Sequence, residues 1–504
     1  MLKSKRTKYC LLFTLLFALL CSAYRYLSLG FSGDSTLIYQ GGDVLYQISL
    51  GRFLQPVYWL IRGQLTAPFL IGFFATAFFL LSAILISDVL LIHSPLSLAI
   101  LCGIIVSNET IAVSNATYLP WTDVYALSLL FCVLGVYMDH KLPFGFLISP
   151  IFYVGCLGLY SSYITCAATL LIIKYLKETL EGTDPLLVFK KGIRSVFSLL
   201  LGLLLYALVL KVVLSILRIP ASNEYNGVGR LAEITPESFL SFLPDSYMIP
   251  LKFLFDVHDR QVIASHRALI PVAMNLLILL LFAILLVIRM RRLSTGGRIL
   301  TCFLLLVLPF GMDFVYLIAN GIINGLMIFS FYFFYLLCPI ALETIPKVSF
   351  VRKNRFFRYA FVFPILLVVL MNVRFSNQLA IKRDVEYQST LSAVSRILED
   401  AESTPGYVPG ETEVIINGYL PASRIAMVRE GFEPFTPYQG ARYTYAAAYE
   451  TSTEWYIEYI LGRSMNIISD RARRLLSAEE LDAMPRFPSA GYVRMMDGIL
   501  YINL

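Results

Sequence analysis

Long apolar runs recur along the chain almost to residue 375 and then stop. Each run is close to the roughly 17–25 residues that a helix needs to cross a bilayer. The clearest runs cover residues 9–27, 67–92, 95–114, 118–138, 195–217, 268–288, 299–319, 325–345 and 359–374. This pattern predicts an all-α polytopic membrane protein.

The stretch 143–175 is too long for one span. As a straight helix its 33 residues would run about 50 Å at 1.5 Å per residue, more than the roughly 30 Å of the hydrocarbon core. Lys141 flanks one end, and Lys174 and Lys177 flank the other, which indicates that both ends lie on the same side. We therefore expect two short helices with a break near Gly155–Gly158, and about eleven transmembrane helices in all.

Basic residues between the apolar runs predict the orientation. They cluster at Lys3–Lys8, Lys174–Arg194, Arg289–Arg298 and Lys347–Arg358. With a cytoplasmic N-terminus every cluster is cytoplasmic, as the positive-inside rule requires. The outer side then holds two loops, about 28–66 and 218–267, and everything after residue 375. We expect a multi-pass protein of the inner (plasma) membrane with an extracytoplasmic C-terminus.

The first 27 residues also resemble a signal peptide, because a basic start precedes an apolar run from Tyr9 to Leu20. The small residues that follow, Cys21-Ser22-Ala23, are not of the Ala-x-Ala form. The many later spans make a cleaved signal unnecessary. We expect an uncleaved first span.

After residue 375 the composition becomes polar. Glu386–Glu402 has helical periodicity, and Val414–Ile416 is typical of a short strand. Near the end, Asp497-Gly498 separates two short apolar segments and predicts a hairpin turn. We expect a transmembrane domain over 1–375 and a small soluble α+β domain over 376–504.

Composition excludes several classes of protein. Hydrophobic residues make up 58% of the chain and charged residues 15%, against about 25% charged in soluble domains. The net charge of +7 comes from clusters that flank spans, so no nucleic-acid partner is expected. The eight cysteines show no metal-ligand spacing, and neither zinc nor a disulfide framework is supported.

The first outer loop carries the candidate chemistry: Asp34, Asp43, Arg52 and Arg62. A carboxylate there can act as general base on a sugar hydroxyl, and an arginine can bind a phosphate leaving group. The alternatives are that Asp43 caps a short interfacial helix and that the arginines contact lipid headgroups.

Three more acidic residues, Glu109, Asp123 and Asp313, lie in or near spans, where ionisable groups are costly and often functional. An interfacial position is the alternative for Glu109 and Asp123, and helix packing is the alternative for Asp313. Carboxylates could hold a divalent ion, but no ligand set stands out, so the cofactor stays open.

The chain resembles the bacterial O-antigen glucosyltransferases, which belong to the membrane-embedded C-type glycosyltransferases. The resemblance rests on short motifs along the chain: Gly42-Asp43, Gly51-Arg52, Gly158-Leu-Tyr160-Ser-Ser-Tyr163, Val414-Ile-Ile-Asn-Gly418, Pro485-Arg-Phe-Pro488 and Asp497-Gly498. Tyr160 therefore becomes a further candidate. Such proteins often have paired acidic residues where only Asp43 matches here, and Asp34 could substitute for the missing partner.

The resemblance implies an enzyme that takes a sugar, expected to be glucose, from a polyprenyl-phosphate-linked donor on the outer membrane face. The acceptor would be a cell-envelope glycan. Asp43 would act as the base of an inverting displacement and Arg52 would bind the lipid phosphate, with Arg62 as second choice. The alternatives are a lipid-linked sugar flippase or transporter, which would favour inverted repeats that we do not detect, and an envelope glycan polymerase or ligase.

Overall fold

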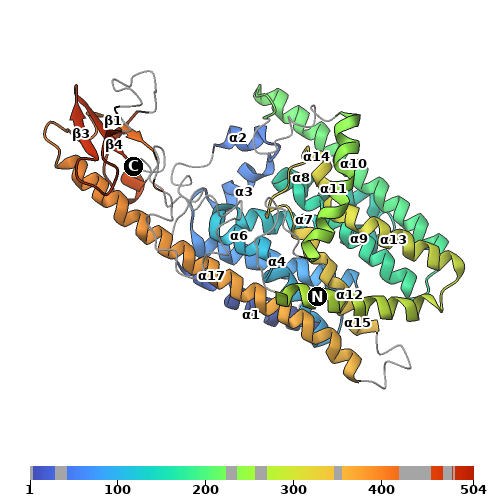
Figure 1. Cartoon of the computed structure of the whole chain (residues 1–504). Coiled ribbons are helices and arrows are strands. Elements are labelled where there is room, and N and C mark those ends of the chain that lie inside the picture. The colour runs from blue at the N-terminus through green and yellow to red at the C-terminus, as the bar shows by residue number, and fades with distance from the viewer. Residues whose placement is uncertain are drawn as a thin grey trace.

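The computed structural model (Figure 1) describes residues 4–28, 43–222, 235–255, 269–344, 355–418, 420, 456–468, 480 and 483–504, and all statements below concern these residues. Over them the chain is a bundle of helices with a small sheet domain beyond one end. A long helix, α17 (Arg355–Glu402), runs along the bundle and continues into the sheet domain.

Nine helices in the described part of the chain are long and apolar enough to cross a membrane, which confirms a polytopic helical protein. The bundle helices are α1 (Lys5–Leu27), α4 (Pro68–Val89), α5 (Pro95–Val106) with α6 (Glu109–Thr117), α7 (Thr122–Lys141), α8 (Gly145–Tyr160) with α9 (Ile164–Leu180), α10 (Pro185–Leu217), α12 (Leu269–Met290), α13 (Thr295–Asp313) and α17. Shorter elements are α2 (Val44–Ser49), α3 (Leu54–Arg62), η3 (Leu119–Trp121), η4 (Ser161–Tyr163), α11 (Pro236–Leu254), α14 (Val315–Ile318), η7 (Phe329–Leu336) and α15 (Leu337–Thr344). If α8 and α9 are counted as two segments and η7–α15 is added, these nine helices become the eleven expected segments.

Local sequence signals set where these helices begin. Ser4, Ser94, Asp184 and Ser294 each accept a backbone N–H of the first turn with the side chain, which satisfies a donor that the helix leaves unpaired. Proline follows the cap directly in α5 and α10, where its missing N–H costs nothing.

The pair α8–α9 is a helical hairpin, as the length argument predicted, but the predicted break at Gly155–Gly158 is wrong. The chain breaks at η4, and both glycines lie inside α8. Their role is close packing, because a Cβ on Gly155 would lie 2.8 Å from the Phe131 ring and one on Gly158 would lie 2.9 Å from the Phe53 ring.

Both ends of this hairpin lie at the same end of the bundle. α8 follows α7 after a three-residue turn, and Asp139 near the end of α7 accepts a hydrogen bond from the Ser195 hydroxyl. Ser195 also lies 2.6 Å from the Tyr175 hydroxyl oxygen of α9. The apex η4 therefore faces the opposite end of the bundle.

Residues from three of the predicted basic clusters lie at that same end, which we call the basic end, whereas most of the fourth cluster lies outside the described residues. Asp88 binds Arg6 at 2.7 Å and Lys141 at 3.0 Å, which joins α4 to α1 and α7. Glu178 binds Lys191 at 3.2 Å, and this contact joins α9 to α10. Arg194 also binds Asp139 of α7 at 3.4 Å, so residues of the clusters Lys3–Lys8 and Lys174–Arg194 both lie against the end of α7.

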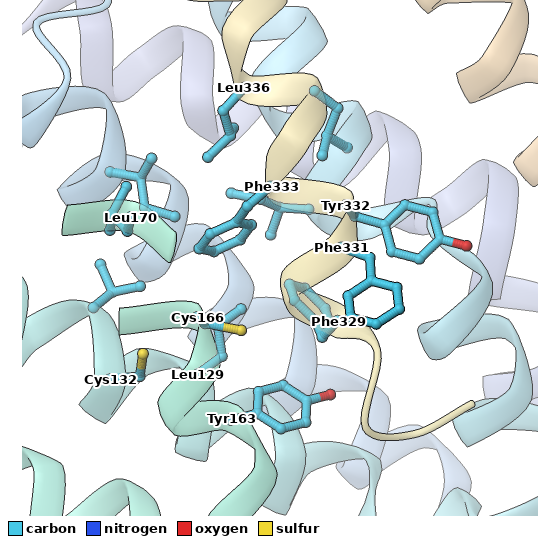
Figure 2. Packing of buried hydrophobic residues seen from close by; sticks show 14 of the residues in the cluster. Leu129, Cys132, Tyr163, Cys166, Leu170, Phe329, Phe331, Tyr332, Phe333 and Leu336 are labelled. Atoms are coloured by element: carbon cyan, nitrogen blue, oxygen red, sulfur yellow. The ribbon is translucent and has the colours of Figure 1, made fainter. Parts of the chain in front are cut away.

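Aromatic and aliphatic side chains fill the centre of the bundle, and Figure 2 shows part of this core. Tyr163 at the end of η4 and Cys166 and Leu170 on α9 face Phe329 and Phe333 on η7. The Tyr163 and Phe329 ring centroids lie 5.3 Å apart. By contrast, α10 exposes much of its surface, including Leu200, Leu204 and Leu208. An apolar outer face of this kind suits contact with lipid.

The C-terminal domain is a four-stranded sheet packed on the end of α17. Its elements are β1 (Glu413–Asn417), η10 (Tyr456–Ile460), β2 (Asn466–Ile467), β3 (Val493–Met496) and β4 (Ile499–Asn503), and the strand order is β2-β1-β4-β3. β3 and β4 form the predicted hairpin, with positive φ at both Asp497 and Gly498, the geometry that an Asp-Gly turn favours. The predicted strand at 414–416 is β1.

α17 connects the two apolar cores without a break at the predicted boundary of 375/376. Its 48 residues extend about 72 Å at 1.5 Å per residue. Asp384 accepts a hydrogen bond of 2.8 Å from Tyr24 on α1, and Arg383 donates one of 2.8 Å to Thr117 on α6. These contacts tie α17 to the bundle at the end opposite the basic end.

Candidate active site

The first loop folds into two short helices, α2 and α3, that pack on the apex of the α8–α9 hairpin. The Gln55 side chain donates a 2.8 Å hydrogen bond to the Leu159 carbonyl, and the Tyr206 hydroxyl donates one of 3.0 Å to the Gly51 carbonyl. Both anchors are buried. The loop is therefore held on the bundle at the end opposite the basic end.

Asp43 caps α2, which was the alternative to a catalytic role. Its Oδ1 accepts the Tyr46 backbone N–H at 3.0 Å. The side chain is nevertheless exposed, so capping leaves the carboxylate in reach of a hydroxyl group from outside. Asp34, the other acidic candidate of this loop, lies outside the described residues.

Arg52 lies three residues beyond the end of α2 and nine residues after Asp43. Its Nη1 donates to the Gln47 side-chain oxygen at 3.2 Å, and its guanidinium carbon lies 5.6 Å from the centre of the Tyr160 ring. The side chain is half-buried. In the part of the chain that the structure describes, no carboxylate lies within 4.0 Å of it, so its positive charge is oriented without being neutralised.

Arg62 is in a different situation, because Asp123 neutralises it. The two side chains are 1% and 0% exposed, and Arg62 Nε lies 3.1 Å from Asp123 Oδ2, an ion-pair contact without hydrogen-bond alignment. Arg62 also donates to the Leu65 and Pro120 carbonyls at 2.9 Å each. Such a pair fastens α3 to the start of α7.

Tyr58 completes this buried cluster. Its hydroxyl donates a 2.8 Å hydrogen bond to Asp123 Oδ2, and burial together with the Asp123 carboxylate raises the pKa of Tyr58. Asp123 is therefore buried, not interfacial. Sequence spacing gave no signal for Tyr58, which lies between apolar neighbours of α3.

Tyr160 forms the floor beneath Arg52. Its ring packs against Tyr125 at 4.5 Å and Tyr163 at 5.5 Å between centroids, and only 6% of the residue is exposed. An aromatic face beneath a guanidinium stabilises the cation. The structure thus places Arg52 over Tyr160, puts Asp43 at the start of the helix whose Gln47 holds Arg52, and commits Arg62 to Asp123.

Residues 30–369 match the family model for glucosyl transferase GtrII, which covers about two thirds of the chain. The chain belongs to the GtrII glucosyl transferase family. No curated protein and no solved structure matched it. All the site residues named above lie within the family match, whereas the C-terminal sheet domain lies beyond its end.

Membership of the GtrII family makes this chain a glycosyltransferase, with a sugar donor, an acceptor and a membrane location. The family implies glucosyl transfer in the modification of cell-envelope glycans. The flippase and transporter alternative therefore loses its support.

The remaining acidic candidates lie deeper. Glu109 is 3% exposed and accepts a 3.0 Å hydrogen bond from the Tyr332 hydroxyl. Asp313 is 2% exposed, and its Oδ2 has no hydrogen-bond partner in the described structure. No group of three or more metal-ligating side chains occurs among the residues that the structure describes.

Proposed function

We propose that this protein transfers a glucosyl group from a polyprenyl-phosphate-linked donor to a cell-envelope glycan such as O-antigen. The observation that carries the proposal is the Arg52 guanidinium. It is fixed by Gln47 and Tyr160, has no carboxylate within 4.0 Å among the described residues, and lies just beyond α2, the helix that the exposed Asp43 caps. An unneutralised cation at a membrane boundary is suited to a lipid phosphate.

The proposed reaction is a single displacement with inversion at the anomeric carbon. Asp43 takes the proton of the acceptor hydroxyl, and the hydroxyl oxygen forms a bond to the anomeric carbon. The bond from that carbon to the phosphate oxygen breaks, and its electron pair leaves with the polyprenyl phosphate. Arg52 stabilises the negative charge of this leaving group.

Asp34 is proposed as the acidic partner of Asp43. Arg62 is the weaker candidate for phosphate binding, because Asp123 and two carbonyls already occupy its guanidinium. An arginine with its donors filled would have to break buried contacts before it could bind a phosphate.

The basic end of the bundle is proposed to face the cytoplasm, in line with the positive-inside rule. The N-terminus is then cytoplasmic, and α2, α3 and the C-terminal domain lie on the outer side of the inner membrane. A donor attached to a polyprenyl chain would keep its tail in the lipid while its phosphate reaches Arg52.

Transfer of labelled glucose from polyprenyl-phosphate-glucose to envelope polysaccharide tests this proposal in membranes that contain the protein. Asp43→Asn keeps an N-cap side chain but removes the base, and we expect transfer to fall by about 10²–10⁴-fold. The matched control is Asp184→Asn, because Asp184 caps α10 at the basic end in the same way, with a 3.1 Å contact. We expect that variant to transfer normally.

Equal rates for wild type and Asp43→Asn would remove Asp43 from the mechanism. No transfer by the wild type from this donor would show that the donor class is wrong.

A further inference from the structure

A groove of about 460 Å³ lies in the C-terminal domain, outside the family match. Its volume is within the roughly 300–1,000 Å³ typical of small-ligand sites. Its lining comes from α17 (Ser389, Ser392, Ala393 and Arg396), from Leu420 after β1, and from Phe487 and Pro488 before β3.

The groove wall is one continuous face of α17. Its four residues there are spaced 0, 3, 4 and 7 along the helix, the spacing that places side chains on one side. A different face, with Val394, Ile397, Leu398 and Ala401, is buried in the core of the sheet domain. α17 therefore contributes one face to stability and presents another, with two hydroxyls and a guanidinium, to the groove.

The opposite wall is aromatic and held in place. The Arg396 guanidinium carbon lies 5.1 Å from the centre of the Phe487 ring, and Tyr492 packs edge-on against that ring at 5.1 Å. The Tyr492 hydroxyl donates a 2.7 Å hydrogen bond to Asp400. Burial and the Asp400 carboxylate raise the pKa of Tyr492, so this hydroxyl stays protonated and the contact persists at neutral pH.

The polar groups of the groove are available for a ligand. Ser392 and Arg396 are exposed, and within the described ranges no carboxylate lies within 4.0 Å of Arg396. Serine hydroxyls both donate and accept hydrogen bonds, and the guanidinium donates several. Hydroxyl and guanidinium groups beside a ring and a proline match the hydroxyl groups and apolar faces of a sugar chain, whereas a lipid tail would leave them unpaired.

The position of the groove relates it to the candidate active site. Arg396 lies twelve residues beyond Asp384, the residue that fixes α17 to α1, and this separation is about 18 Å along the helix. Figure 1 shows α17 carrying the sheet domain beyond the end of the bundle where α2 and α3 lie. A polymer with one unit near Arg52 can therefore extend toward this domain.

We propose that the groove binds the acceptor glycan at sugar units distant from the one that receives glucose. The inference rests on the proposed function for the identity of its ligand as an acceptor. It assigns the C-terminal domain a role in substrate affinity: the groove holds the polymer, and the chemistry takes place at the bundle. Filling the groove should therefore raise KM for long acceptors and leave kcat unchanged.

The test uses the full-length protein in lipid nanodiscs and the polysaccharide released from the envelope of the producing cells. Binding is measured without donor, and transfer kinetics are measured with long polysaccharide and with single repeat units. Ser392→Trp fills the groove, and Arg396→Ala removes the guanidinium. Ser403→Trp is the matched control, because Ser403 is exposed just past the end of α17 and lies outside the groove.

We expect Ser392→Trp and Arg396→Ala to weaken polysaccharide binding by about tenfold or more, the effect of losing a hydrogen bond to a charged group. KM for long acceptors should rise in parallel, with KM for single repeat units unchanged. Ser403→Trp should behave as wild type. Unchanged binding by both groove variants, or no binding by the wild type, would overturn the inference.

The two proposals fail in different ways. Groove-dependent binding without any transfer would contradict the proposed function and keep the groove as a glycan site. Normal transfer with unchanged binding in the groove variants would contradict the groove inference alone. Circular dichroism and gel filtration show whether each variant folds. If Ser392→Trp does not fold, Arg396→Ala decides whether the groove binds glycan, because this change removes an exposed side chain and adds no bulk.

Discussion

Replacing Asp123 with alanine removes the negative partner of a guanidinium that is 1% exposed. Arg62 would keep its hydrogen bonds to two carbonyls, but its charge would stay buried without compensation, and the Tyr58 hydroxyl would lose its acceptor. Removing one partner of a buried pair typically costs about 3–5 kcal/mol. We therefore expect Asp123→Ala to lower the unfolding temperature clearly.

The double variant Arg62→Met/Asp123→Leu distinguishes the loss of the whole ion pair from the loss of one partner. It replaces both charges with apolar side chains, so no uncompensated charge remains in the cluster. We expect it to recover most of the loss, because exchanging a buried ion pair for apolar groups is often close to neutral. A double-mutant cycle then gives the coupling between the two residues.

The buried thiols of this protein allow its unfolding temperature to be measured by thiol labelling. Cysteines 10, 21, 102, 132, 156, 166 and 338 are free and buried, and Cys302 is exposed. A thiol-reactive dye in detergent therefore reports unfolding as these thiols become accessible, with Cys302→Ser lowering the background. Equal unfolding temperatures for wild type and Asp123→Ala would refute the structural role of the pair and return Arg62 to the phosphate-binding candidates.

Three further changes test other parts of the structure. Arg52→Ala should reduce glucosyl transfer by about 10²–10³-fold, as loss of a group that stabilises developing charge does. Its unfolding temperature should stay close to that of the wild type, because Arg52 is half-buried and lacks an ion-pair partner among the described residues. A stable variant with full activity would exclude Arg52 from the mechanism. Gly158→Ala would place a Cβ 2.9 Å from the Phe53 ring and should cost about 1–3 kcal/mol, measured with the same dye; no loss would mean that α3 is not held against α8. Asp313→Asn should leave stability equal or higher, because Asp313 Oδ2 makes no hydrogen bond in the described structure that the amide would lose; a marked drop would show a partner.

The membrane-spanning helices were predictable because bilayer thickness sets their length. The same argument predicted the α8–α9 hairpin, since one helix over 143–175 would have been too long for the membrane. It could not place the break, because glycine serves both turns and close packing. Only the three-dimensional contacts of Gly155 and Gly158 show that here they serve packing.

The candidate site was predictable in its residue types and not in its pairings. Asp43 and Arg52 stood out as charged residues in an outer loop, and the structure keeps them exposed and half-buried, respectively. Arg62 has the same residue type as Arg52, but its contact with Asp123 joins segments far apart in the sequence. Periodicity and spacing carry no information about such a contact, and for that reason Tyr58, which also contacts Asp123, was missed as well.

The most direct test of the account is the side of the membrane on which transfer occurs. Right-side-out and inside-out vesicles that contain the protein and labelled polyprenyl-phosphate-glucose would receive envelope polysaccharide in the surrounding medium. We predict transfer in right-side-out vesicles, because α2 and α3 lie at the end opposite the basic clusters. Transfer confined to inside-out vesicles would place Asp43 and Arg52 in the cytosol and contradict the account.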